Sequence, residues 1–269
     1  MSELKREAVF PGLQVKHLTV KYDNGFQAVK DCSFQVEPGE IVALVGPNGC
    51  GKSSMLKAVA QLISHKGEVS IGAQQLSKLS RKERVALLSY VPQIAEMDVD
   101  LTAREIVRLG ATAGRGLFAK AKAGDEARVT HALQHVSMLD REHSRWTELS
   151  GGQRQRLSIA RALAQESQVI MLDEPTNHLD IEHQMLLVKL LRHVVSDHKS
   201  SAVIVLHDLG LAARMADKIV VMNAGEIKTF GEPVNALRPE IIENYFRVKG
   251  HIVHSAAGAA ALMIEDQAE

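Results

Sequence analysis

The apolar run Ile41-Val42-Ala43-Leu44-Val45 and the sequence after it, Gly46-Pro47-Asn48-Gly49-Cys50-Gly51-Lys52-Ser53, decide the fold of this chain. A helical pattern, Ser54–Ile63, follows directly. Glycines at this spacing let a loop wrap a phosphate group with its N–H groups pointing inward, and the next helix presents its positive end. The terminal lysine can reach the β- and γ-phosphates, and the serine hydroxyl can bind magnesium. The stretch therefore predicts a nucleotide-binding loop, with an ordinary glycine-rich turn as the alternative.

Short strands alternate with helical patterns along the rest of the chain, which predicts an α/β fold. The predicted strands are Val15–Val20, Cys32–Val36, Ile41–Val45, Glu68–Ile71, Val169–Leu172, Ala202–Leu206, Lys218–Met222 and Ile227–Phe230. Three of them are continuously apolar, as parallel strands covered on both faces must be. We therefore expect Ile41–Val45, Val169–Leu172 and Ala202–Leu206 at the centre of the sheet.

The regions outside this alternation predict three further parts. Turn sequences at Asp23–Gly25 and Glu37–Glu40 indicate an antiparallel β-layer near the N-terminus. Helical periodicity without strong strands, from about 102 to 165, predicts an inserted helical lobe. The sequence from His251 to Glu269 is alanine-rich and weakly patterned, and it carries no recognisable chemistry.

Composition excludes several classes of protein. Of the 269 residues, 45% are hydrophobic and 24% charged, which is ordinary globular usage and excludes disordered and collagen-like chains. Lys plus Arg and Asp plus Glu each total 32, so we expect no nucleic acid partner. The charged N-terminus, Met1–Glu7, and the absence of an 18-residue apolar run predict neither a signal peptide nor a membrane-spanning helix. The only two cysteines, Cys32 and Cys50, cannot build a disulfide framework or a zinc site.

Two carboxylates follow the apolar strand Val169–Leu172. Asp173, at the strand end, can hold magnesium directly or through water. Glu174 can reach toward a γ-phosphate and polarise an attacking water as a general base. The alternative is a solvated strand terminus, which the nucleotide-binding loop upstream makes the minority interpretation.

The sequence Leu149-Ser150-Gly151-Gly152-Gln153 precedes a helical pattern and lies shortly before Asp173. Ser150 is a natural N-cap, and apolar residues follow at helical spacing. Taken alone, this Ser-Gly-Gly cap could be purely structural. Together with the loop and the acidic pair in the same order, it resembles the signature motif of the ATP-binding cassette (ABC) ATPases.

Four more positions resemble landmarks of that family. Tyr22 follows the first strand, like the aromatic residue that stacks on adenine. Gln93, in Tyr90-Val91-Pro92-Gln93, corresponds to the Q-loop glutamine. Asp180, in Asn177-His178-Leu179-Asp180, corresponds to the D-loop, and His207 corresponds to the switch histidine. For each residue the alternative is ordinary packing, helix capping or surface exposure.

The resemblance covers about residues 13 to 240. It implies the α/β P-loop NTPase fold of an ABC nucleotide-binding domain over 13–245, with a mixed central sheet, an N-terminal antiparallel β-layer and an inserted helical lobe at about 95–165. Residues 246–269 are then an extension of unknown role. The nucleotide-binding residues implied are Tyr22, Gly46, Pro47, Asn48, Gly49, Cys50, Gly51, Lys52, Ser53 and Ser54.

The resemblance also implies a reaction, ATP hydrolysis with Mg²⁺. The implied catalytic residues are Glu174, His207, Gln93 and Lys52, and the implied metal ligands are Ser53, Gln93 and Asp173. In the family two copies sandwich each ATP, so Ser150, Gly151, Gly152 and Gln153 are expected to act in trans, with Asp180 running along the partner.

A chain without a spanning helix implies separate permease subunits, and separate subunits are typical of importers. The stretches 76–84 and 179–184 are similar to the ATPases of iron-siderophore, haem and cobalamin importers, whereas Ala111–Phe118 departs from them. We therefore expect the ATPase of an iron-siderophore-type importer, at the cytoplasmic face of the membrane, with an extracytoplasmic binding protein as an indirect partner. The alternatives are another cargo (haem, cobalamin, a metal ion or an exported compound) and a non-transport ABC ATPase.

Overall fold

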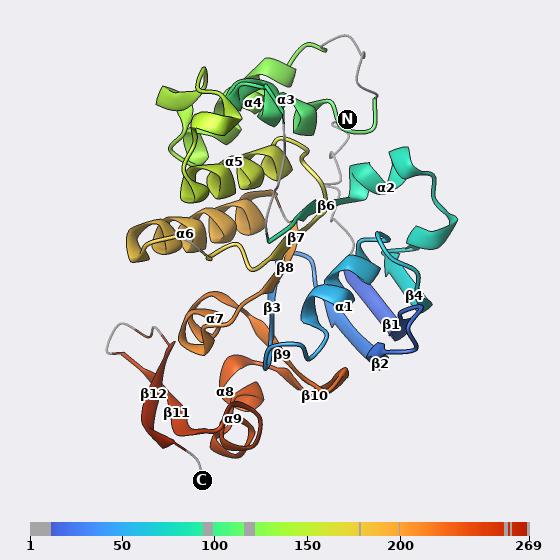
Figure 1. The fold of residues 1–269 in the computed structure, drawn as a ribbon, viewed down its shortest axis with the longest axis vertical. Helices are drawn as coiled ribbons and strands as arrows, with labels where there is room; N and C mark the ends of the chain where they lie inside the picture. Colours follow the sequence, from blue (N-terminus) through green and yellow to red (C-terminus); the bar gives the residue numbers. More distant parts are fainter. Residues whose placement is uncertain are drawn as a thin grey trace, which may run out of the picture.

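A six-stranded mixed sheet forms the centre of the protein in a computed structural model that describes residues 12–93, 99–115, 122–177, 179–198, 200–255, 258 and 260–267 (Figure 1). The strand order is β10-β9-β3-β8-β7-β6, and every neighbouring pair is parallel except β10 with β9. The strands are β3 (Ile41–Val45), β6 (Leu88–Val91), β7 (Val169–Asp173), β8 (Ser201–Val205), β9 (Lys218–Asn223) and β10 (Glu226–Gly231).

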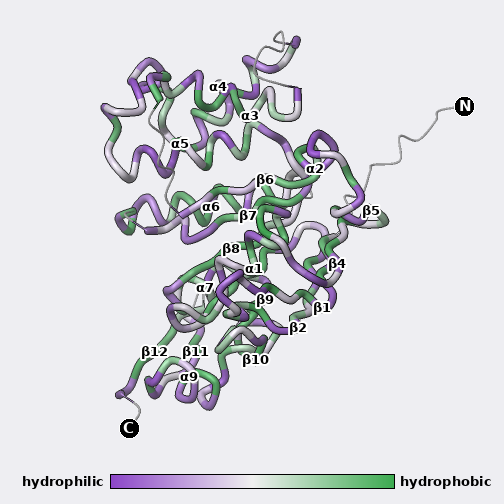
Figure 2. Tube along the Cα trace, turned by 45° about the vertical axis from the view of Figure 1, so that its right-hand side comes forward, coloured by the Kyte–Doolittle hydropathy of each residue, from purple (hydrophilic) through white to green (hydrophobic). Residues whose placement is uncertain are grey.

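The three strands expected at the centre, β3, β8 and β7, are neighbours, and every residue in them is buried. Alternate residues face two different apolar cores: Val42 and Leu44 face one, and Ile41, Ala43 and Val45 face the other. This two-sided burial is why these strands are continuously apolar, and Figure 2 shows hydrophobic colour along β6, β7 and β8. β6 was not predicted, because it is short and comes directly after helix α2 (Arg81–Leu87), with no turn sequence between the two.

One core lies between the central sheet and the expected antiparallel layer, which is confirmed. This layer has the order β2-β1-β4-β5. Its strands are β1 (Leu13–Lys21), β2 (Gln27–Val36), β4 (Lys66–Ile71) and β5 (Gln74–Gln75). Helix α1 (Lys52–Val59) packs within the same core through Met55 and Leu56. It ends earlier than the predicted Ser54–Ile63, because Gln61 adopts φ 60° and the Leu62 N–H bonds back to the Lys57 carbonyl at 2.9 Å.

Within the predicted helical region lie α3 (Ala103–Ala111), α4 (Asp125–His135) and α5 (Gly151–Leu163). These three helices, together with α6 (Ile181–His198), α7 (Leu209–Met215), α8 (Pro233–Ala236) and α9 (Pro239–Phe246), contribute to the core on the other face of the sheet. Helix α2 instead adds Leu87 to the core on the side of the antiparallel layer. α3, α4 and α5 pack together around residues such as Trp146 and Leu133 and lie to one side of the sheet in Figure 1. Within the described ranges, no helix is both long and apolar enough to cross a bilayer.

The C-terminal part differs from its weakly patterned sequence. β11 (Val248–His254) and β12 (Ala260–Gln267) form an antiparallel hairpin. β12 packs against α7, and β11 packs against α9. Most residues of the hairpin stay partly or fully exposed. Because so few of these residues are buried, the sequence shows no clear alternation of apolar and polar residues. Contacts with α7 and α9 therefore determine the structure of the hairpin.

Gly110 provides a test of how α3 and α5 pack. A Cβ atom at Gly110 would lie 1.9 Å from the Arg161 carbonyl oxygen, a backbone atom that cannot move aside alone. We expect Gly110→Ala to lower the free energy of unfolding by about 1–3 kcal/mol, because the two helices must separate. Gly231→Ala is the matched control, since its Cβ would meet only Asn235 at 4.0 Å. Equal urea midpoints for the two variants would contradict this packing.

Candidate active site

The loop Gly46–Ser53 connects β3 to α1 and needs glycine at two points. Gly51, the N-cap of α1, has φ 108°, and a Cβ there would lie 2.2 Å from the Ala28 carbonyl oxygen. A Cβ at Gly46, which has φ 152°, would lie 2.2 Å from the Met222 carbonyl oxygen. Side chains larger than hydrogen are therefore excluded where the loop passes the neighbouring strands.

Positive charge collects inside this loop. The buried Lys52 ammonium donates to the carbonyl oxygens of Gly46 at 2.7 Å and Pro47 at 3.0 Å. Gly51 has no side chain with which to cap the first turn of α1, whose N–H groups point toward the loop. Asn48 and Gly49 form its exposed tip. The loop can therefore receive an anion such as a phosphate.

Asp173, at the end of β7, is held through both carboxylate oxygens. The Ser53 hydroxyl donates to Oδ1 at 2.9 Å, and the Tyr90 hydroxyl donates to Oδ2 at 3.1 Å. Burial raises the pKa of Asp173, although both donated hydrogen bonds lower it. The sequence analysis did not single out Tyr90 as a site residue. The signal that could have found it is its position three residues before Gln93, at the end of a strand beside β7.

Glu174 is contacted by two side chains from other parts of the chain and by Asn177, three residues further along. Gln93 Nε2 lies 2.5 Å and Asn177 Nδ2 2.7 Å from Oε2, and His207 Nε2 lies 2.5 Å from Oε1. Glu174 is only 7% exposed and adopts φ 50°, a left-handed conformation that is uncommon outside glycine. Its N–H donates to the Val205 carbonyl at 3.2 Å, which supports that conformation. Asn177 is a contact that the sequence analysis did not single out.

The parallel sheet explains why these residues meet. Gln93, Glu174, His207 and the loop at Gly46 follow β6, β7, β8 and β3, whose carboxyl ends lie along one edge. Tyr22 comes from the antiparallel layer instead. Its hydroxyl lies 2.9 Å from the Ser54 hydroxyl in the first turn of α1, and it is 40% exposed. An aromatic face is therefore available beside the loop.

The residues of the predicted signature form a separate site. Ser150 caps α5 in a capping box: its N–H donates to Gln153 Oε1 at 2.9 Å, and its hydroxyl accepts from the Gln153 N–H at 3.4 Å. Asp180 caps α6 by accepting from the His183 N–H at 2.9 Å. These residues line a cavity of about 410 Å³. Its lining residues are Ser150, Gly151, Gly152, Gln153, Arg156, Leu179, Asp180 and His183.

No residue of the loop Gly46–Ser53 lines that cavity. In Figure 1, α5 lies well away from α1. One copy of the chain thus holds the loop and the signature residues at two different places. His178, within the predicted D-loop sequence, lies outside the described residues.

The chemistry of the donors limits which metal the site can hold. In the part of the chain that the structure describes, no three His, Cys, Asp or Glu side chains are arranged to hold a metal ion by themselves. Ser53 Oγ and Asp173 Oδ1 nevertheless place two oxygens side by side. Two protein oxygens suit Mg²⁺, which keeps several waters and takes further oxygens from bound phosphates.

Comparison with known proteins decides the family. Residues 29–177 match the family model described as ABC transporter. The chain belongs to this family. It is therefore an ABC ATPase, and the expected α/β fold of that class is confirmed. It is 33% identical to the iron(3+)-hydroxamate import ATP-binding protein of Bacillus subtilis, over 84% of both chains. It is 31% identical to the ferric enterobactin transport ATP-binding protein of Escherichia coli, over 94% of this chain and 93% of that one.

Solved structures agree with this family. A metal-chelate type ABC transporter in an inward-facing conformation matches with a TM-score of 0.80 and 26% identity, over 95% of this chain and 98% of the other. A second solved structure is an ATP-binding cassette in a dimeric post-hydrolysis state, bound to ADP and phosphate. It matches with a TM-score of 0.75 and 29% identity, over 82% of this chain and 98% of the other. The ABC ATPase fold thus extends over most of the chain.

Cys50, inside the loop, offers a chemical probe of this site. Burial raises the pKa of its thiol, although the Lys52 ammonium, which lies 3.9 Å from the sulfur, lowers it. A redox-sensitive thiolate, one hypothesis for a cysteine near a helix N-terminus, is therefore not favoured. We expect iodoacetamide to modify Cys50 more slowly than a free cysteine at pH 8, and faster as the pH rises, since only the thiolate reacts.

Mass spectrometry of the peptide that contains Cys50 would measure this rate, with the urea-unfolded chain as control. A Cβ at Gly46 would lie only 2.8 Å from the Cys50 sulfur, so the loop has little room for a bulky adduct. Complete modification with N-ethylmaleimide should therefore block nucleotide binding. Full ATP binding by the modified protein would contradict the prediction.

Proposed function

We propose that this chain is the ATP-hydrolysing subunit of an importer that takes up an iron-siderophore-type chelate through separate permease subunits. The observation that carries the proposal is the position of Glu174. Its buried carboxylate lies between Gln93, Asn177 and His207, next to the loop with Lys52. A carboxylate placed there can act on a water beside the terminal phosphate of a bound nucleotide.

ATP would bind with its phosphates in the loop Gly46–Ser53. The N–H groups of the loop and of α1 would donate to the phosphate oxygens, and Lys52 would supply positive charge at the β- and γ-phosphates. Tyr22, exposed beside Ser54, would stack on the adenine ring. Ser54 would contact the phosphates from the first turn of α1.

Mg²⁺ would be held by Ser53 and Asp173, with Gln93 as a further contact. When bound, the ion neutralises charge on the β- and γ-phosphates. Tyr90 then has a positioning role: its hydrogen bond to Asp173 Oδ2 leaves Oδ1 directed at Ser53. These residues fix the position of the terminal phosphate relative to Glu174.

Glu174 would orient the attacking water and accept its proton. Its left-handed backbone and its three side-chain donors fix the carboxylate in a single orientation. His207, 2.5 Å from Oε1, can donate to the γ-phosphate when nucleotide is bound. Gln93 links the same carboxylate to β6 and so to the segment that leads to the helical lobe.

Two copies of the chain would complete each site. Ser150, Gly151, Gly152 and Gln153 line a cavity away from the loop of their own chain, so a second copy has to supply them to a bound ATP. The first turn of α5, which Ser150 caps, would then face the γ-phosphate with the positive end of the helix. Two solved structures of one relative, an ATP-binding cassette, are dimeric at 29% and 30% identity and support this arrangement.

The importer part of the proposal rests on the relatives. The names of two of them specify iron(3+)-hydroxamate and ferric enterobactin, and a structural relative is a metal-chelate type transporter. Permease subunits would hold the chain at the cytoplasmic face of the membrane, and an extracytoplasmic binding protein would deliver the cargo. Haem is a second candidate cargo, because the hemin import ATP-binding protein of Shewanella denitrificans is 34% identical over 88% of this chain.

Glu174→Gln tests the catalytic part. We expect it to lower ATP turnover by about 10²-fold or more, because the amide cannot accept the proton of the water. ATP binding should persist, and size-exclusion chromatography with ATP should show an ATP-bound dimer. Lys52→Ala is the matched control and should weaken ATP binding itself. Hydrolysis at the wild-type rate by Glu174→Gln would remove Glu174 from the proposed role.

Isolation of the chain from its native host in mild detergent tests the transport part. We expect a multi-helix permease to co-purify and cargo-loaded binding protein to raise the ATPase rate. Ferric siderophore and haem, each loaded on its candidate binding protein, would separate the two cargoes. Recovery of ribosomes or nucleic acid, with no permease, would overturn the transport role and leave the ATPase chemistry standing.

A further inference from the structure

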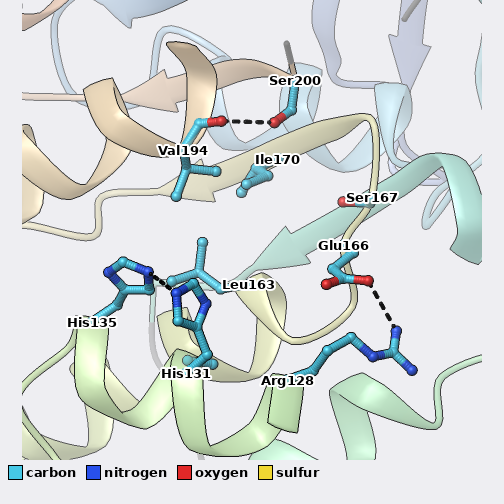
Figure 3. A pocket seen from close by; sticks show the side chains of 10 residues that line it. Arg128, His131, His135, Leu163, Glu166, Ser167, Ile170, Val194 and Ser200 are labelled. Carbon is cyan, nitrogen blue, oxygen red and sulfur yellow. Dashed lines mark hydrogen bonds and ion pairs between the residues drawn. The ribbon is translucent and has the colours of Figure 1, made fainter. Parts of the chain in front are cut away.

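A pocket of about 340 Å³ lies between α4, α6 and the ends of α5 and β7, outside the candidate active site. Figure 3 shows side chains from these elements around it. Its floor is apolar, with Leu163, Ile170 and Val194. The complete lining is Arg128, His131, Ala132, His135, Leu163, Glu166, Ser167, Ile170, Val194 and Ser200.

Most polar groups of the pocket already pair with protein atoms on its wall. Arg128 and Glu166 form an ion pair at 3.3 Å, and the Ser200 hydroxyl donates to the Val194 carbonyl at 3.2 Å. His131 and His135 also pair, with each other, through their ring nitrogens. Their Nε2 atoms are 3.0 Å apart, and the dashed line in Figure 3 marks this contact.

We propose that His131 and His135 form a chelating site for a divalent transition-metal ion. The two residues are four positions apart on α4, so their side chains lie on the same face of the helix. Two imidazole nitrogens bound to one zinc ion, at 2.0–2.1 Å each, lie about 2.9–3.4 Å apart. The observed separation of 3.0 Å falls within that range.

Only a small adjustment separates the observed pair from a chelate. The two rings are edge to face, at 80°, so one ring has to rotate about its Cβ–Cγ bond for both lone pairs to meet. His131 is exposed and the pocket is open beside it, which leaves room for this rotation and for an ion with its waters. The donating ring moves its hydrogen from Nε2 to Nδ1 by exchange with water, so both rings bind as neutral ligands.

His193 can add a third ligand from a different part of the fold. It lies on α6, and its ring centre is 5.5 Å from that of His135. No three donors among the described side chains converge as they stand, so a turn of the His193 side chain has to accompany this contact. The ion would then join α4, in the helical region, to α6 beside the sheet. Imidazole ligands favour Zn²⁺, Cu²⁺ and Ni²⁺ over Mg²⁺ and Ca²⁺.

Calorimetric titration of the untagged, chelator-treated chain with Ni²⁺ tests the proposal. Millimolar Mg²⁺ in the buffer would occupy the oxygen ligands near Asp173. We expect one Ni²⁺ per chain with micromolar affinity. His131→Ala and His135→Ala should each weaken binding by at least about tenfold, because each removes a direct ligand. His193→Ala should weaken it less.

His143→Ala is the matched control, since this histidine also lies in the helical region but is 86% exposed, with its Nε2 3.3 Å from Glu142 Oε1. Its affinity for Ni²⁺ should equal that of the wild type. If His131→Ala lowers the melting temperature, His131→Gln takes its place in the comparison of Ni²⁺ affinities. Unchanged affinity in His131→Ala or His131→Gln would overturn the proposal. Electron paramagnetic resonance of the Cu²⁺-loaded wild type gives a second test: coupling to two or more imidazole nitrogens supports the chelate, and its absence overturns it.

Discussion

The parallel pairing of β7 with β6 and β8 is the constraint on which the rest of the site depends. It aligns Tyr90 with Met171 and Asp173 with Val205, so the residues after each strand emerge at one edge. Glu174 can reach Gln93 and His207 only because these strands end together. A register shift of one residue would turn every side chain of β7 to the opposite face and so into the other core.

That alignment has an energetic cost at Glu174. A carboxylate that is 7% exposed loses hydration, and a left-handed backbone adds strain of the order of 1–3 kcal/mol. Three side-chain donors and the bond from the Glu174 N–H to Val205 offset both. Strain of this kind persists where the surroundings determine the conformation, and it concentrates at functional sites. The geometry is thus consistent with a residue that is fixed for chemistry rather than for stability.

The helical region is tied to the sheet by polar as well as apolar contacts. Arg115 and Arg128 both pair with the fully buried Asp125, and Arg128 also reaches Glu166 after α5. The Lys122 N–H, which donates to the same carboxylate at 2.7 Å, and then the two arginines hold the pKa of Asp125 well below its usual range. The histidine pair on α4 lies next to this network. A metal bound there would lie near Leu163 at the end of α5, whereas the signature residues lie at the start of that helix.

The sequence by itself determined the features that depend only on residues close together along the chain. Continuous apolar runs identified β3, β7 and β8, and the spacing of Gly46, Gly51 and Lys52 identified the loop, because these signals are local. The sequence also determined the order of the expected motifs, and hence the family.

Only the tertiary structure decided which of these residues meet. Tyr90 and Gln93 lie close to the carboxylates because separate strands end at one edge, and no local pattern encodes that distance. The strand β6 and the hairpin β11–β12 were not predicted, because they are short or half-exposed and their pairing partners are remote in sequence. The separation of Ser150 from Lys52 likewise depends on how the helical region packs against the sheet, which long-range contacts determine.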